Sequence, residues 1–182
     1  MLLRKSSPRK TSCSQKAYRS GRLSHRSFLS EGEEMVNTPR TYSEWRQLFD
    51  MIKKRTNDAE VLQAMRSGTI EWQSGIADRF SQKLVDAINF RMNKAGDNFQ
   101  KTMAHSGGEA GVIRALESLR KEYYFLCCAV DIPCLPEDIR KKYIGLIIDQ
   151  ANKTQESLEN SSRQDRSGRL LYLIRQHRVN NF

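Results

Sequence analysis

The sequence predicts an all-α fold, an antiparallel helical bundle built on three long helices with shorter helices at its ends. Apolar residues recur at intervals of three and four through most of the chain, which places them on one face of a helix. No stretch alternates polar and apolar residues with a period of two, so we expect no β-sheet. The three long helices are expected at about 70–104, 109–130 and 137–160.

The first clear helix is expected to begin at Thr41, whose hydroxyl can accept from the Glu44 amide while the Glu44 carboxylate reaches back. Its apolar face has helical spacing and consists of Trp45, Leu48, Phe49 and Ile52. Asn57 and Asp58 can cap a second, short helix. Gly68 is expected just after its end, where a left-handed backbone is needed.

The first long helix, about 70–104, is expected to begin at Ile70 or Ile76, and it carries apolar residues every three or four positions from Phe80 to Met103. Spacing of this kind over so many turns is typical of a helix packed against other helices. Gly96 lies inside the helix and weakens it locally. The glycine-rich stretch 105–111 is expected to be a turn to the next helix.

The second long helix, 109–130, is expected to present a heptad-like seam of the kind found in coiled coils. The seam consists of Val112, Leu116, Leu119, Tyr123, Leu126 and Val130. The third, 137–160, follows Pro136, which suits a helix start, and acidic residues there complement the helix dipole. A short helix over 170–177 completes the fold.

The net charge of +10 is concentrated at the two ends of the chain. Residues 1–34 hold eight Lys or Arg against three Glu, and residues 163–182 hold five Arg against one Asp. The part between them holds 18 basic and 17 acidic residues. A nucleic-acid-binding fold usually spreads a basic stripe over its own helices or strands. Any polyanion is therefore expected to meet the ends.

Residues 1–37 are expected to form a disordered basic leader, separate from a helical domain over 38–182. Residues 1–30 hold eight Ser and eight Lys or Arg, no acid and no periodicity. Three interpretations compete: a mitochondrial transit peptide, a basic arm for nucleic acid, and upstream sequence that is not normally translated. Codons for the Glu-Gly-Glu before Met35 can spell a purine-rich ribosome-binding element. This favours translation from Met35 in a bacterium.

No motif in the sequence carries a reaction, and no catalytic residue, metal or other cofactor is expected. Cys127, Cys128 and Cys134 lack the paired spacing of a zinc site. The histidines do not have the Arg–His spacing used by some helical ribonucleases, except His25 in the leader. The glycines near residue 107 lack the Lys-Ser/Thr of a phosphate-binding loop. A nuclease or other hydrolase with a dispersed site remains the second alternative.

The cysteines and the hydropathy indicate a reduced, cytoplasmic protein. Four cysteines, two of them adjacent, give no disulfide framework for a chain of 182 residues. No apolar run approaches the roughly 20 residues needed to cross a bilayer. We therefore expect no membrane partner.

The Arg-rich segment 163–178 gives the clearest functional indication. It uses arginine and no lysine, and guanidinium groups suit bidentate contact with phosphate. The candidate anion or nucleic-acid contacts are Arg163, Arg166, Arg169, Arg175 and Arg178. Alternatively, this segment docks on the bundle through its leucines, and its arginines are solvated or paired with acids.

The sequence favours a non-enzymatic interaction, scaffold or regulatory protein that binds a protein partner or associates with itself. This rests on long amphipathic helices without a reactive motif; nucleic-acid binding through 163–178 is the alternative. Trp45 and Trp72 fit the core most simply, but together with Tyr124 they are candidate partner contacts if exposed, because aromatic residues dominate interface energetics. Tyr123 and Tyr124 cannot both face one seam, so one should lie near the surface.

Overall fold

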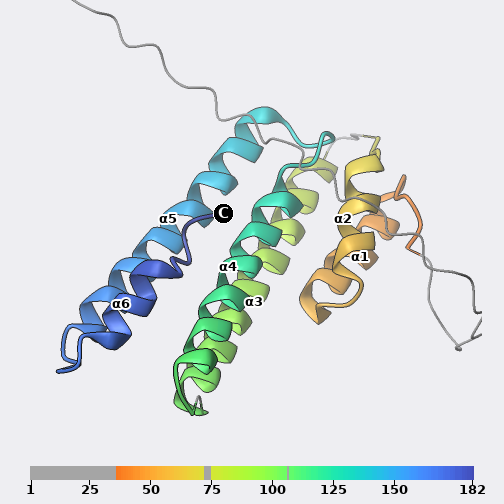
Figure 1. Ribbon diagram of the computed structural model, residues 1–182. Helices are drawn as coiled ribbons and strands as arrows, with labels where there is room; N and C mark the ends of the chain where they lie inside the picture. The colour runs from red at the N-terminus through yellow and green to blue at the C-terminus, as the bar shows by residue number, and fades with distance from the viewer. Residues whose placement is uncertain (1–35, 72–74, 106) are drawn as a thin grey trace, which may run out of the picture. The chain divides into compact units, whose positions relative to one another are not determined.

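The computed structural model describes residues 36–71, 75–105 and 107–182, which belong to one compact unit, Met35–Phe182 (Figure 1). Within these residues the secondary structure is helical and contains no strand, which confirms the predicted class. The described helices are α1 (Tyr42–Lys54), α2 (Asp58–Ser67), α3 (Ile76–His105), α4 (Glu109–Val130), α5 (Glu137–Ser162) and α6 (Arg169–Gln176). The expected leader, including Met35, lies outside the described residues except for positions 36 and 37.

The three long helices run antiparallel in succession, with α4 between the other two (Figure 1). α3 and α5 both pack against α4 but make no contact with each other. α1 packs on α3, and α2 packs on α1 and α4. On the other side, α6 packs on α4 and α5. One side of α5 is therefore left without a helix against it, which matters for the candidate site.

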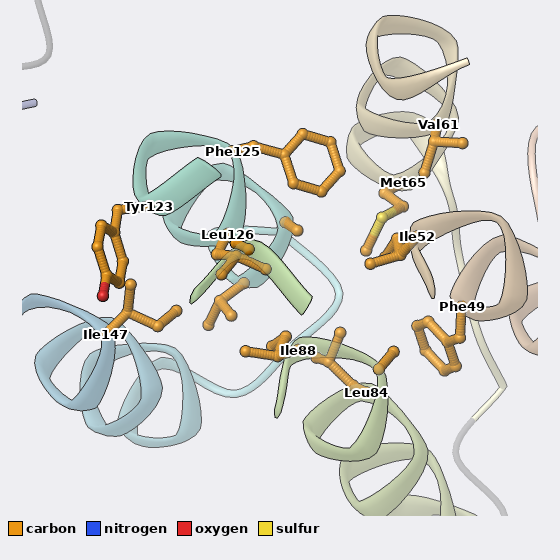
Figure 2. Close-up of a cluster of buried hydrophobic side chains, with 14 of the residues drawn as sticks. Phe49, Ile52, Val61, Met65, Leu84, Ile88, Tyr123, Phe125, Leu126 and Ile147 are labelled. Atoms are coloured by element: carbon orange, nitrogen blue, oxygen red, sulfur yellow. The ribbon is translucent and has the colours of Figure 1, made fainter. Parts of the chain in front are cut away.

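The predicted seams form the core. The α4 seam is buried except for half-buried Val112, and Figure 2 shows Tyr123 of α4 beside Ile147 of α5. Between α1 and α3, the Trp45 and Phe49 rings each meet the Phe80 ring edge-on, at centroid distances of 5.1 Å. Full burial of a large apolar side chain contributes roughly 1.5–3 kcal/mol. Burial of these helix faces therefore holds the bundle together.

The start of α1 is confirmed as a capping box. The Thr41 hydroxyl accepts from the Glu44 amide at 3.4 Å, and Glu44 Oε2 accepts from the Thr41 amide at 2.9 Å. The four apolar residues of the predicted face are buried. α1 ends at Arg55, whose backbone is left-handed with φ of 60°. This conformation is costly for a residue with a β-carbon, and it directs Arg55 to the candidate site described below.

The prediction for Gly68 is wrong about the backbone. Its φ is −69° and its ψ is 148°, which is extended rather than left-handed. Glycine is required there by close packing instead, because a β-carbon would lie 2.5 Å from Trp45 Cζ2 and 2.8 Å from Pro39 Cγ. The Trp45 indole donates to the Thr69 carbonyl at 3.0 Å, which fixes the ring against this segment.

The starts of α2 and α3 match the prediction only in part. α3 begins at Ile76, the later of its two expected starts and not at Ile70, and Gly75 before it has φ of 81°, a left-handed conformation. Asn57 precedes α2, but its side chain makes no capping hydrogen bond. The Asp58 carboxylate does not cap either, because it binds a buried arginine on α3. At the start of α2, a tertiary contact thus takes the place of the expected local cap.

Candidate functional site

A buried arginine joins the helices of the N-terminal half. Arg91 on α3 is 1% exposed, and its Nη1 and Nη2 donate to the two carboxylate oxygens of Asp58 at 2.7 and 2.6 Å. Its Nε donates to Glu122 Oε2 at 2.8 Å, and Nη1 also donates to the Ile52 carbonyl at 3.2 Å. Its guanidinium lies 3.7 Å from the centroid of the Phe125 ring. Each of α1, α2 and α4 therefore supplies a contact to this one side chain.

Arg55 completes what we call the buried ion network, which consists of Arg55, Asp58, Arg91 and Glu122. Arg55 Nη2 pairs with Glu122 Oε1, so both Glu122 oxygens are bound to arginines. Two cations and two anions balance, as buried charges require. Burial lowers the pKa of Arg91, but the hydrogen bonds that Arg91 donates to Asp58 and Glu122 outweigh it and raise that pKa above its ordinary value. Arg91 is therefore permanently charged.

A cleft of about 940 Å³ opens beside this network, which we call the α3–α4 cleft. Its walls are the last turns of α3 and the first turns of α4, and Arg55 reaches it from the end of α1. Its charged lining residues are Arg55, Lys101, Glu109, Arg114 and Glu122. Sequence reasoning missed the cleft, and the available signal was Arg91, a charged residue within the apolar face of α3.

The predicted C-terminal arginines include two that are paired with acids. Arg169 donates from Nε and Nη2 to the two Glu109 oxygens at 2.5 and 2.9 Å, which joins the start of α6 to the start of α4. The Arg169 hydrogen bonds lower the pKa of Glu109. Arg175 contacts Glu159 of α5 at 3.4 Å. Leu173 and Ile174 are buried, so α6 docks through apolar residues.

The other three predicted arginines are exposed. Arg163 follows the end of α5, and Arg166 lies in the turn before α6. Arg178 Nε donates to Asn180 Oδ1 at 3.3 Å. Anion binding by this segment stays a prediction that rests mainly on these three side chains.

The three aromatic residues that were predicted as candidate partner contacts, Trp45, Trp72 and Tyr124, differ in where the structure places them. Trp45 is 0% exposed, so its interaction role is corrected to a core role, because its indole fills the space beside Phe80 and Gly68. Trp72 lies outside the described residues. Tyr123 is buried and Tyr124 is 50% exposed, as their adjacent positions on α4 required. Tyr124 as a partner contact stays a prediction.

α5 carries an apolar stripe at the edge of the side that lacks a helix neighbour. The α5 stripe consists of Ile139, Tyr143 and Leu146, spaced by four and three residues. Leu146 is 53% exposed, whereas Ile139 and Tyr143 are half-buried and pack against the core. At 100° per residue, Leu146 lies opposite Gln155 on the helix. Gln155 faces α6, because its Nε2 donates to the Ile174 carbonyl at 3.3 Å. Leu146 therefore points away from α6.

The cysteines and histidines among the described residues do not form a group of metal ligands. Burial raises the pKa of Cys127 to about 12 and that of Cys134 to about 11. His105 Nδ1 donates to the Lys101 carbonyl at 2.7 Å. Within the described residues, no three His, Cys, Asp or Glu side chains lie together as metal ligands would. In the same residues, every helix is too short or too polar to cross a membrane.

Comparison with known proteins identifies no relative of this chain. No family model matches it, and no curated protein or solved structure is significantly similar to it.

Proposed function

We propose that this chain is a non-enzymatic helical interaction protein that associates with a second copy of itself through the α5 stripe. The observation that carries the proposal is the 53% exposure of Leu146 on a helix side that no other helix covers. Half-buried Ile139 and Tyr143 lie beside it on the same helix and also pack against the core. Burying such a side chain against a partner contributes roughly 1.5–3 kcal/mol. Long amphipathic helices commonly associate through stripes of this kind.

The charges beside the stripe favour a second copy as the partner. Lys142 precedes Leu146 by four residues, Asp149 follows it by three, and both are exposed. In an antiparallel pairing of two α5 helices centred between Gly145 and Leu146, Lys142 of one copy meets Asp149 of the other, and the reverse contact repeats by symmetry. Neither side chain forms an ion pair within the described part of the chain. Such pairs set the orientation of an interface more than its strength.

The proposal is tested by light scattering on the full chain over a range of concentrations. The wild type is expected to shift from monomer to dimer as its concentration rises, and Leu146→Glu is expected to stay monomeric. Gln63→Glu is the control, because it adds the same charge at an exposed position on α2. Asp149→Lys should weaken the dimer, and Lys142→Asp combined with Asp149→Lys should restore it. A wild type that stays monomeric at every soluble concentration contradicts the proposal.

The second candidate function is nucleic-acid binding through the C-terminal arginines, supported by the exposure of Arg163, Arg166 and Arg178. Phosphate contacts would make the affinity fall steeply with salt. Removal of 163–182 is a poor test, because it also removes the buried side chains of Leu173, Ile174 and Val179. The triple change of Arg163, Arg166 and Arg178 to Gln keeps the core. It should abolish salt-sensitive binding of a duplex, and unchanged binding rejects this function.

A further inference from the structure

We propose that the α3–α4 cleft is a binding site for a small phosphorylated organic molecule. Three cationic side chains from three helices line it: Arg55 from the end of α1, Lys101 from α3 and Arg114 from α4. Cations that converge from separate elements suit a compact, multiply charged anion. This site is separate from the α5 stripe and shares no residue with it.

The acids of the cleft are already paired with arginines, so they leave the charges of Lys101 and Arg114 uncompensated. Glu122 is bound on both oxygens by Arg55 and Arg91. Glu109 is bound on both oxygens by Arg169, which comes from outside the lining. Lys101 and Arg114 form no ion pair within the described residues. When the acids are counted with their partners, the cleft retains a net positive charge.

Arg55 is held in place before any ligand arrives. Its left-handed backbone turns it out of α1, and Glu122 binds its Nη2. Glu122 is in turn fixed by Arg91, which Asp58 holds through two hydrogen bonds. The Nε and Nη1 groups of Arg55 make no hydrogen bond to described residues, so they remain available as donors. A donor that is ordered in advance loses little entropy on binding.

The remaining lining indicates that the ligand is larger than inorganic phosphate. Apolar side chains face the cleft beside the cations: Ala95, Phe99, Ala115 and Leu119. A volume of about 940 Å³ lies within the range of small-molecule sites. An aromatic or aliphatic body can therefore lie against Phe99 and Leu119 while its phosphate meets the cations. A phosphate monoester satisfies both parts of the lining.

The test is an NMR titration of the ¹⁵N-labelled full chain with phenyl phosphate, inorganic phosphate and benzoate. Phenyl phosphate should perturb amides of the cleft walls and bind with a dissociation constant on the order of 1 mM, as expected for a fragment. Inorganic phosphate lacks the apolar body and benzoate lacks the second charge, so each should bind several-fold more weakly. Lys101 and Arg114 are exposed, so each can be replaced without disturbing the core. Lys101→Gln and Arg114→Gln should each lower the affinity for phenyl phosphate about five- to tenfold.

Arg166→Gln is the matched control, because it removes an exposed arginine far along the sequence from the cleft. It should change the affinity for phenyl phosphate less than twofold. The proposal is overturned if the cleft amides do not respond, or if the shifts centre on 163–178. It is also overturned if Arg166→Gln weakens binding as much as Arg114→Gln, since binding would then follow total charge rather than the cleft.

Discussion

Arg91 and Asp58 form a two-fold hydrogen-bonded ion pair that joins the middle of α3 to the first residue of α2, with N–O distances of 2.7 and 2.6 Å. The arginine is buried, whereas the aspartate is partly exposed. Glu122 adds a second carboxylate from α4. This guanidinium therefore helps to fix α2 on the bundle, together with the buried apolar face of α2, and it helps to position Arg55 through Glu122.

We expect Arg91→Met to lower the free energy of unfolding by about 3–5 kcal/mol, because Glu122 is left buried with one arginine and Asp58 loses its partner. Urea denaturation followed by circular dichroism measures this change. Lys141→Ala is the control, since it removes an exposed ion pair with Glu137 and should cost about 0.5 kcal/mol or less. If Arg91→Met and Lys141→Ala lower the free energy of unfolding equally, the buried ion network does not hold the helices together.

Two glycines should respond to alanine in opposite directions. Gly68→Ala places a methyl group against Trp45 and Pro39 and should destabilise the fold by about 1–3 kcal/mol. Gly96→Ala lies inside α3 with open space around the added carbon, so it should stabilise the fold by about 0.5–1 kcal/mol. Thermal denaturation of both variants shows whether each substitution stabilises or destabilises the fold. A stable Gly68→Ala would contradict the packing described for Trp45.

The Glu109–Arg169 pair should make the attachment of α6 sensitive to acid. Hydrogen bonds from Arg169 lower the pKa of Glu109 in the folded state, so proton binding favours the state without the pair. The stabilisation is present above the unfolded pKa of Glu109 and is lost as the pH falls through its folded pKa. NMR titration of the Glu109 carboxyl carbon should show a higher pKa in Arg169→Gln. An unchanged pKa would show that the pair is absent in solution.

The buried thiols should resist alkylation. Because burial raises the pKa of Cys127 to about 12 and of Cys134 to about 11, both remain protonated near pH 8, and the thiolate is the reactive form. Iodoacetamide followed by mass spectrometry should label these two cysteines slowly in the folded chain and rapidly in urea. Fast labelling of Cys127 in the folded chain would show that the end of α4 opens readily.

Much of the fold was predictable because helical periodicity and capping residues act locally. The Thr41–Glu44 capping box and the α4 seam needed only spacing along one helix, and the structure confirms both. Gly68 is a position where local signals gave the wrong backbone conformation. A glycine after a helix usually marks a left-handed residue, but here it marks the approach of Trp45 from another helix.

The candidate sites were harder to predict because they depend on which helices meet. Leu146 has the spacing of a core residue and becomes a surface residue only because α3 and α5 do not touch. The α3–α4 cleft combines Arg55 with residues far away in sequence. Arg169 looked like an anion contact, yet it binds Glu109, sixty positions earlier. Pairings between distant helices leave no periodic signal in the sequence.

The exposure of the α5 stripe at low and at high protein concentration tests the proposed function most directly. Hydroxyl-radical footprinting with mass spectrometry reads the accessibility of individual side chains. We predict that oxidation of Tyr143 and Leu146 falls as the concentration rises, while oxidation of exposed Tyr172 on α6 stays constant. Oxidation of Tyr143 and Leu146 that does not change with concentration would contradict self-association through α5.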